Sequence, residues 1–114
     1  MNMEITQRHL DDVLILDLAG RVTIGEGTIV LRSRIQNLLN AGNRKILLNL
    51  AEVDYIDSSG LGELVSTFTT VRNRDGDLKL LNLTRRVRDL MQITKLLTVF
   101  DTYENEAAAL KAFR

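Results

Sequence analysis

Two carboxylates, two adjacent hydroxyls and two glycines lie together in the stretch VDYIDSSGLGELV, residues 53–65. Asp57 is followed directly by Ser58 and Ser59, and a helical pattern of apolar residues begins just after them. An oxygen on Asp57 or Ser58 suits a helix N-cap, because it can accept a hydrogen bond from a free backbone N–H. One interpretation of this stretch is therefore a structural cap, with no further role for the serines.

The same residue types also suit a phosphorylation site. A helix N-terminus presents free N–H groups and the positive end of the helix dipole, and both favour an added anion. A phosphate on Ser58 or Ser59 would add about −1.5 to −2 charges beside Asp54 and Asp57. A partner that accepts the neutral hydroxyl would then reject the charged surface. Local chemistry alone does not decide between the two serines.

Gly60 and Gly62 are unusual so early in a helix. Glycine in a helix costs up to ~1 kcal/mol relative to alanine, and it allows another group to approach the backbone closely. We therefore expect these glycines to open the start of the helix to a partner, with Leu61 beginning the apolar face.

The residues needed for nucleophilic catalysis, disulfide bonds or metal binding are absent or not in the required pattern. Neither serine lies in the G-x-S-x-G pattern of a nucleophile elbow, and the only histidine, His9, is predicted on an edge strand facing solvent. The chain has no cysteine, which excludes a disulfide, a thiolate zinc site and a cysteine nucleophile. Asp54, Asp57 and Glu63 have no His or Cys beside them, so no metal site is indicated. We expect a protein that is not an enzyme and needs no cofactor.

Two further segments carry weaker signals. GEG at residues 25–27 lacks the third glycine of a dinucleotide-binding loop, and is predicted to free the loop before the first helix, where it could join a binding surface. TRRVRD at residues 84–89 is basic. It is interpreted as a solvated helix face, or alternatively as a rim patch for an acidic partner.

Composition narrows the class of protein. The 114 residues and their 45% hydrophobic content suit one domain with one core, over residues 1–114. The 15 Lys and Arg balance 15 Asp and Glu, which gives no support for nucleic-acid binding. The N-terminus has no apolar signal region, and no apolar run approaches the ~20 residues of a membrane span. We expect a cytoplasmic protein that does not bind membranes.

Hydrophobic periodicity predicts alternating strands and helices. Near-continuous apolar runs indicate strands buried on both faces, and apolar residues at spacings of three and four indicate helices. The predicted strands are Met3–His9, Val13–Gly20, Lys45–Leu50, Leu78–Leu83 and Thr98–Tyr103, and the helical patterns cover residues 31–39, 61–71, 87–91 and 104–113. The order β-β-α-β-α-β-α-β-α predicts an α/β fold, with a mostly parallel sheet of four or five strands and an opening hairpin.

LNLAEVDYIDSSGLGELV resembles the signature of the STAS domain, and specifically of the bacterial anti-sigma-factor antagonists. VLILDLAGRV resembles the second strand and following loop of that family, and ENEAAAL resembles its last helix. Within the resemblance one departure stands out. Many antagonists carry an acidic residue shortly after the second strand, where this chain has Val22, Thr23 and Ile24. Thr23 is the candidate to replace that acid as a hydrogen-bonding group.

The resemblance implies a phosphorylation-switched binding protein, acting as a monomer or weak dimer. Its expected partner is an anti-sigma factor that is also a serine kinase of the histidine-kinase-like ATPase fold. Binding would release a sigma factor. Phosphorylation of Ser58, the serine that directly follows the aspartate, would end binding. A PP2C-type phosphatase would remove the phosphate and restore binding. The resemblance also allows an alternative, a scaffold or stress-signalling STAS domain that assembles with other proteins without a phosphorylation cycle.

Overall fold

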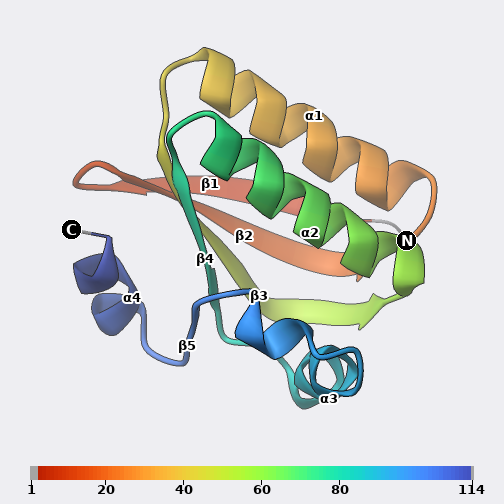
Figure 1. Cartoon of the computed structure of the whole chain (residues 1–114). Helices are drawn as coiled ribbons and strands as arrows, with labels where there is room; N and C mark the ends of the chain where they lie inside the picture. The colour runs from red at the N-terminus through yellow and green to blue at the C-terminus, as the bar shows by residue number, and fades with distance from the viewer. Residues whose placement is uncertain (1–2, 114) are drawn as a thin grey trace.

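A five-stranded sheet forms the centre of the computed structural model, which describes residues 3–113 (Figure 1). The strands lie side by side in chain order: β1 Glu4–Leu10, β2 Val13–Val22, β3 Lys45–Ile56, β4 Asp77–Leu81 and β5 Thr102–Tyr103. β1 pairs antiparallel with β2 through the predicted hairpin, and every later pair is parallel. The predicted mixed, mostly parallel α/β sheet is confirmed.

Helices cover the two faces of the sheet unequally. α1 Glu26–Asn40 and α2 Ser58–Asn73 lie side by side over one face, and α4 Glu106–Ala112 lies on the other side (Figure 1). α3 Arg85–Ile93 and the short 3₁₀ helix η1 Leu96–Thr98 lie beside the end of β3 (Figure 1). The larger core forms under α1, α2 and α3, and a smaller one forms under α4 around Ile15, Leu47 and Phe113.

Two predicted strands differ from the observed strands by more than two residues. The sequence predicts that the third strand ends at Leu50, but β3 continues to Ile56. This extension buries only Val53 and Ile56, and register shifts against β2 interrupt its alternation, so it lacks the apolar run that marks the first half. Of the predicted last strand, only Thr102–Tyr103 pairs with β4, because η1 occupies its expected start.

The length of β3 determines the position of the segment around Asp57 and Ser58. β3 extends past its pairing with β4, which ends at Asn49, and its last residues pair with β2 alone as far as Val22 and Ile56. The loop after β2 and the start of α2 therefore meet at one end of the sheet. The carboxyl ends of parallel strands are where α/β proteins commonly place functional groups.

An ion pair between a buried carboxylate and a solvent-exposed arginine links α2 to α1. Glu63 of α2 is buried, and its Oε1 accepts from the Arg32 guanidinium of α1 at 2.7 Å. The Thr67 hydroxyl donates to the other oxygen, Oε2, at 3.2 Å. Within residues 3–113, no helix is long and apolar enough to cross a membrane, and no three His, Cys, Asp or Glu side chains gather as a metal site.

Candidate functional site

Asp57, one of the two N-cap candidates in the sequence, is the N-cap of α2. Its backbone is extended, and its Oδ1 accepts from the Gly60 N–H at 2.7 Å. Its carbonyl accepts the first helical bond, from the Leu61 N–H at 2.9 Å. The Asp57 side chain therefore satisfies one of the free N–H groups at the start of the helix, and its main chain accepts the first regular helical bond.

The second oxygen of Asp57 reaches a different element. Oδ2 accepts from the Ile24 N–H at 3.1 Å, in the loop between β2 and α1. The hydrogen bonds from the N–H groups of Gly60 and then Ile24 hold the pKa of the Asp57 carboxyl below its ordinary value of 3.8. The carboxylate thus joins the start of α2 to the β2–α1 loop.

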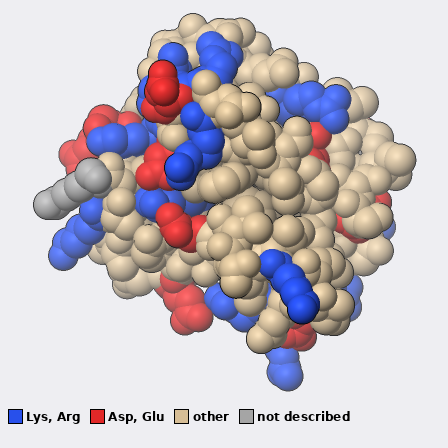
Figure 2. Space-filling model, viewed as in Figure 1, with Lys and Arg blue, Asp and Glu red and all other residues tan. Residues whose placement is uncertain are grey.

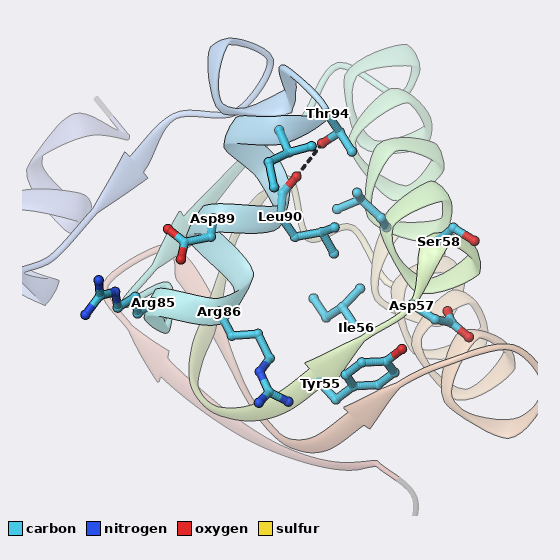
Figure 3. Close-up of a pocket in the computed structure, with 11 residues that line it drawn as sticks. Tyr55, Ile56, Asp57, Ser58, Arg85, Arg86, Asp89, Leu90 and Thr94 are labelled. Atoms are coloured by element: carbon cyan, nitrogen blue, oxygen red, sulfur yellow. Dashed lines mark hydrogen bonds between the residues drawn. The ribbon is translucent and has the colours of Figure 1, made fainter.

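Ser58 and Ser59 differ in exposure. Ser58 is the first residue of α2 and is exposed, whereas Ser59, the next residue, is half-buried. Figure 3 shows the Ser58 side chain at the start of α2 with its hydroxyl directed outwards, away from the adjoining cavity. A second protein therefore meets the Ser58 hydroxyl more readily than that of Ser59.

Gly60 and Gly62 have different roles, which corrects the expectation that both open the helix to a partner. Gly60 is buried, and a β-carbon there would overlap the carbonyl oxygen of Val22 at the end of β2. The close backbone approach expected from the sequence is therefore an internal one. Gly62 is exposed, and a β-carbon there would meet nothing within 4 Å.

A groove of about 830 Å³ opens beside Ser58, between the end of β3, the start of α2 and α3. Ile56, Leu61, Leu90 and Ile93 give it an apolar lining. In Figure 3, Ile56 and Leu90 face each other across the cavity. A groove of this size with apolar walls is typical of a binding surface.

Polar side chains stand at the rim of the groove. Arg86 extends from α3 toward Tyr55 of β3, whereas Arg85 and Asp89 point away (Figure 3). Tyr55 also lies under the guanidinium of Arg21, whose central carbon is 5.7 Å from the ring centroid. Within the described chain, neither Arg85 nor Arg86 forms an ion pair, which fits both the predicted solvated helix face and the alternative rim patch, whereas Arg88 lies 3.6 Å from Glu104.

Comparison with known proteins shows which family has this sequence and fold. The family model of the STAS domain matches residues 4–109, from the first strand into the last helix. The chain belongs to the STAS domain family.

Similar proteins place this STAS domain among the anti-sigma-factor antagonists. It is 33% identical to the anti-sigma-B factor antagonist of Bacillus subtilis, over 89% of this chain and 91% of that protein. It is 30% identical to a Bordetella bronchiseptica protein provisionally named anti-sigma factor antagonist BtrV, over 98% of this chain and 96% of that protein. A crystal structure of a provisionally assigned anti-sigma factor antagonist from Thermotoga maritima superposes with a TM-score of 0.88 at 26% sequence identity. The superposition covers 96% of this chain and 94% of that protein. This family consists of regulatory proteins rather than enzymes.

The STAS fold brings most of the predicted site residues together. Thr23 lies in the β2–α1 loop next to Ile24 and so adjoins Asp57. Leu61 is buried in the groove wall. Asp54 is exposed and does not line the groove. It lies on β3, beyond the predicted strand end at Leu50.

Sequence reasoning missed the exposed apolar residues around the site. Ile24 is 74% exposed and Ile93 is 79% exposed, and neither was singled out as a surface residue. Ile93 carried a usable signal, because it falls off the face of α3 that buries Val87 and Met91. The exposure of Ile24 depends on the path of a loop, which no periodicity reveals.

Proposed function

We propose that this STAS domain is an anti-sigma-factor antagonist switched by phosphorylation of Ser58. The unphosphorylated form binds an anti-sigma factor that is a serine kinase of the histidine-kinase-like ATPase fold, and the sigma factor is released. Phosphorylated Ser58 ends this binding, and a PP2C-type phosphatase restores it. The observation that carries the proposal is the exposed Ser58 hydroxyl at the first position of a capped helix.

The kinase supplies the chemistry of the switch. Ser58 Oγ attacks the γ-phosphorus of ATP, the bond to the β-phosphate oxygen breaks, and ADP leaves while the hydroxyl proton passes to a base of the kinase. ATP and Mg²⁺ belong to the kinase. The STAS domain contributes a hydroxyl held on a fixed helix end, because Asp57 already anchors that end to Gly60 and Ile24.

Charge explains why phosphorylation would end binding. The phosphate adds about −1.5 to −2 charges directly beside the Asp57 carboxylate. Among the described residues, neither Asp54 nor Asp57 forms an ion pair with a Lys or Arg side chain. The hydrogen bonds to the Asp57 carboxylate come from backbone N–H groups, which carry no net charge. A partner surface shaped for the neutral hydroxyl would therefore meet concentrated negative charge.

The test is phosphorylation by the ATPase-type anti-sigma factor encoded in the same genome. We expect the purified kinase with ATP to place one phosphate on Ser58, as located by mass spectrometry. Ser58→Ala should abolish transfer, whereas Ser59→Ala, the matched control, should retain it because Ser59 is half-buried. Full transfer to the Ser58→Ala variant would refute the site. A large stable assembly that captures no ATPase would favour the scaffold alternative.

A further inference from the structure

Ile24 exposes a large apolar side chain beside the proposed phosphorylation site. The side chain is 74% exposed, and the Ile24 N–H is bonded to Asp57, the residue that precedes Ser58. Its neighbours in the loop are uncharged, since Thr23 and Gly25 flank it. The Ile24 side chain therefore offers apolar contact next to the Asp57 carboxylate.

The loop that carries Ile24 is held in one conformation. The Thr28 N–H donates to the Thr23 carbonyl at 3.2 Å, and the Thr28 hydroxyl donates to the Gly25 carbonyl at 3.1 Å. Gly25 has a φ of 96°, which other residues rarely adopt. Fixing a contact loop before binding lowers the entropy lost in the complex.

Other exposed apolar residues lie at the same end of the molecule. Tyr55 is 40% exposed and Ile93 is 79% exposed, and both line the groove that Asp57 and Ser58 share. In Figure 2, charged side chains are sparser toward the edge where the β2–α1 loop and the start of α2 lie than on the opposite side of this face, and some acidic side chains are visible at that edge. An exposed apolar patch of this kind typically marks an interaction surface.

A kinase that phosphorylates Ser58 must cover this patch. Its ATP has to reach the Ser58 hydroxyl, and Ile24 is fixed to the residue next to that serine. Burying Ile24 against apolar atoms favours binding, whereas a charged group opposite it would be stripped of water without a partner. The kinase that fits is therefore one with an apolar recess facing the β2–α1 loop.

We propose that Ile24 is a specificity-determining residue, which inserts into an apolar recess of the partner kinase and selects that kinase over those with a charged surface there. This inference rests on the proposed function. Ile24 acts through docking and touches no reacting atom, so its contribution belongs to Kd and KM and not to kcat.

The experiment compares substitutions at Ile24 with one at Leu10. Leu10 is an exposed apolar residue in the β1–β2 hairpin, at the opposite end of the sheet. With the full chain and the same kinase, Ile24→Asp should raise Kd and KM at least about tenfold, with kcat unchanged. Ile24→Leu and Leu10→Asp should each stay within about twofold of the wild type.

The outcomes separate this inference from the proposed function. If the wild type is phosphorylated on Ser58 and Ile24→Asp has the same KM and Kd, Ile24 is not a determinant and the switch still stands. If the wild type is neither bound nor phosphorylated, both proposals fail. Thermal unfolding checks that each variant is folded. Should Ile24→Asp be unfolded, Ile24→Ser replaces it, with a smaller increase in KM expected and an unchanged KM again refuting the proposal.

Discussion

Gly60 and Gly62, which are separated by one residue near the start of α2, differ in their packing, and only Gly60 lies where the packing requires a glycine. A β-carbon at Gly60 would overlap the Val22 carbonyl oxygen, which belongs to the neighbouring strand and cannot move aside as a flexible side chain would. A β-carbon at Gly62 would point into open space. Gly60 is thus part of the contact between α2 and β2, while Gly62 has no packing contact that requires glycine and weakens the helix.

The two glycine-to-alanine variants should change stability in opposite directions. Gly60→Ala should lower the free energy of unfolding by about 1–3 kcal/mol or more, because the backbone must shift to admit the methyl group. Gly62→Ala should raise it by about 0.4–1 kcal/mol, since alanine restricts the unfolded chain and favours the helix. Urea unfolding followed by circular dichroism measures both. Equal effects at the two positions would contradict this account of the packing.

At the scale of elements, the Asp57 carboxylate joins the start of α2 to the β2–α1 loop. Its pKa is lowered by hydrogen bonds from the N–H groups of Gly60 and Ile24. A carboxyl whose pKa is lowered on folding stabilises the fold above its unfolded value, and this stabilisation is lost as the pH falls through the folded value. The stabilisation is therefore present above about pH 3.8 and lost at lower pH.

Asp57→Ala should lower the Tm at neutral pH, because it removes the cap and the bond to the loop. The difference in Tm from the wild type should shrink as the pH falls below 3.8, where the wild type also loses the carboxylate. Differential scanning calorimetry over this range provides the measurement. Asp54→Ala is the control, because it removes an exposed carboxylate from the same end without a hydrogen bond, and its Tm should remain close to that of the wild type. A pH-independent difference for Asp57→Ala would argue against the charged cap.

The contact between α1 and α2 depends on a buried carboxylate. Glu63 is 5% exposed and is paired with Arg32, whose own side chain lies largely in solvent. Arg32→Met should destabilise the protein, because it leaves the buried charge without its cation. Arg34→Met, on the same helix, removes only an exposed hydrogen bond to Gln7 and should have a smaller effect in urea unfolding. If the two variants are equally stable, the ion pair does not hold the helices together.

At the scale of the whole molecule, the sequence predicts the elements better than it predicts the surface they form. Apolar periodicity identified the strands and helices, and residue chemistry identified Asp57 as a cap. The end of β3 was missed because only Val53 and Ile56 are buried there. The groove was missed because β3 and α3 supply its walls from segments about 30 residues apart, and their meeting depends on the fold.

The proposed switch should leave the fold of the whole molecule intact. Ser58 is exposed, and a negative charge at the first position of α2 interacts favourably with the positive end of the helix. Ser58→Asp should therefore change the free energy of unfolding by less than about 1 kcal/mol. The same variant should weaken binding to the kinase by at least about 2 kcal/mol, roughly thirtyfold, because the complex buries an unpaired charge.

Ser58→Asn separates charge from size in this experiment. Asparagine has nearly the same shape as aspartate but no charge, so this variant should bind the kinase more tightly than Ser58→Asp if electrostatic rejection operates. Titration calorimetry gives both affinities, and urea unfolding gives both stabilities. Equal loss of binding in the two variants would indicate that the larger size of the side chain, and not its charge, weakens binding to the kinase. A large loss of stability in Ser58→Asp would instead mean that phosphorylation acts by disrupting α2, and the charge mechanism would have to be abandoned.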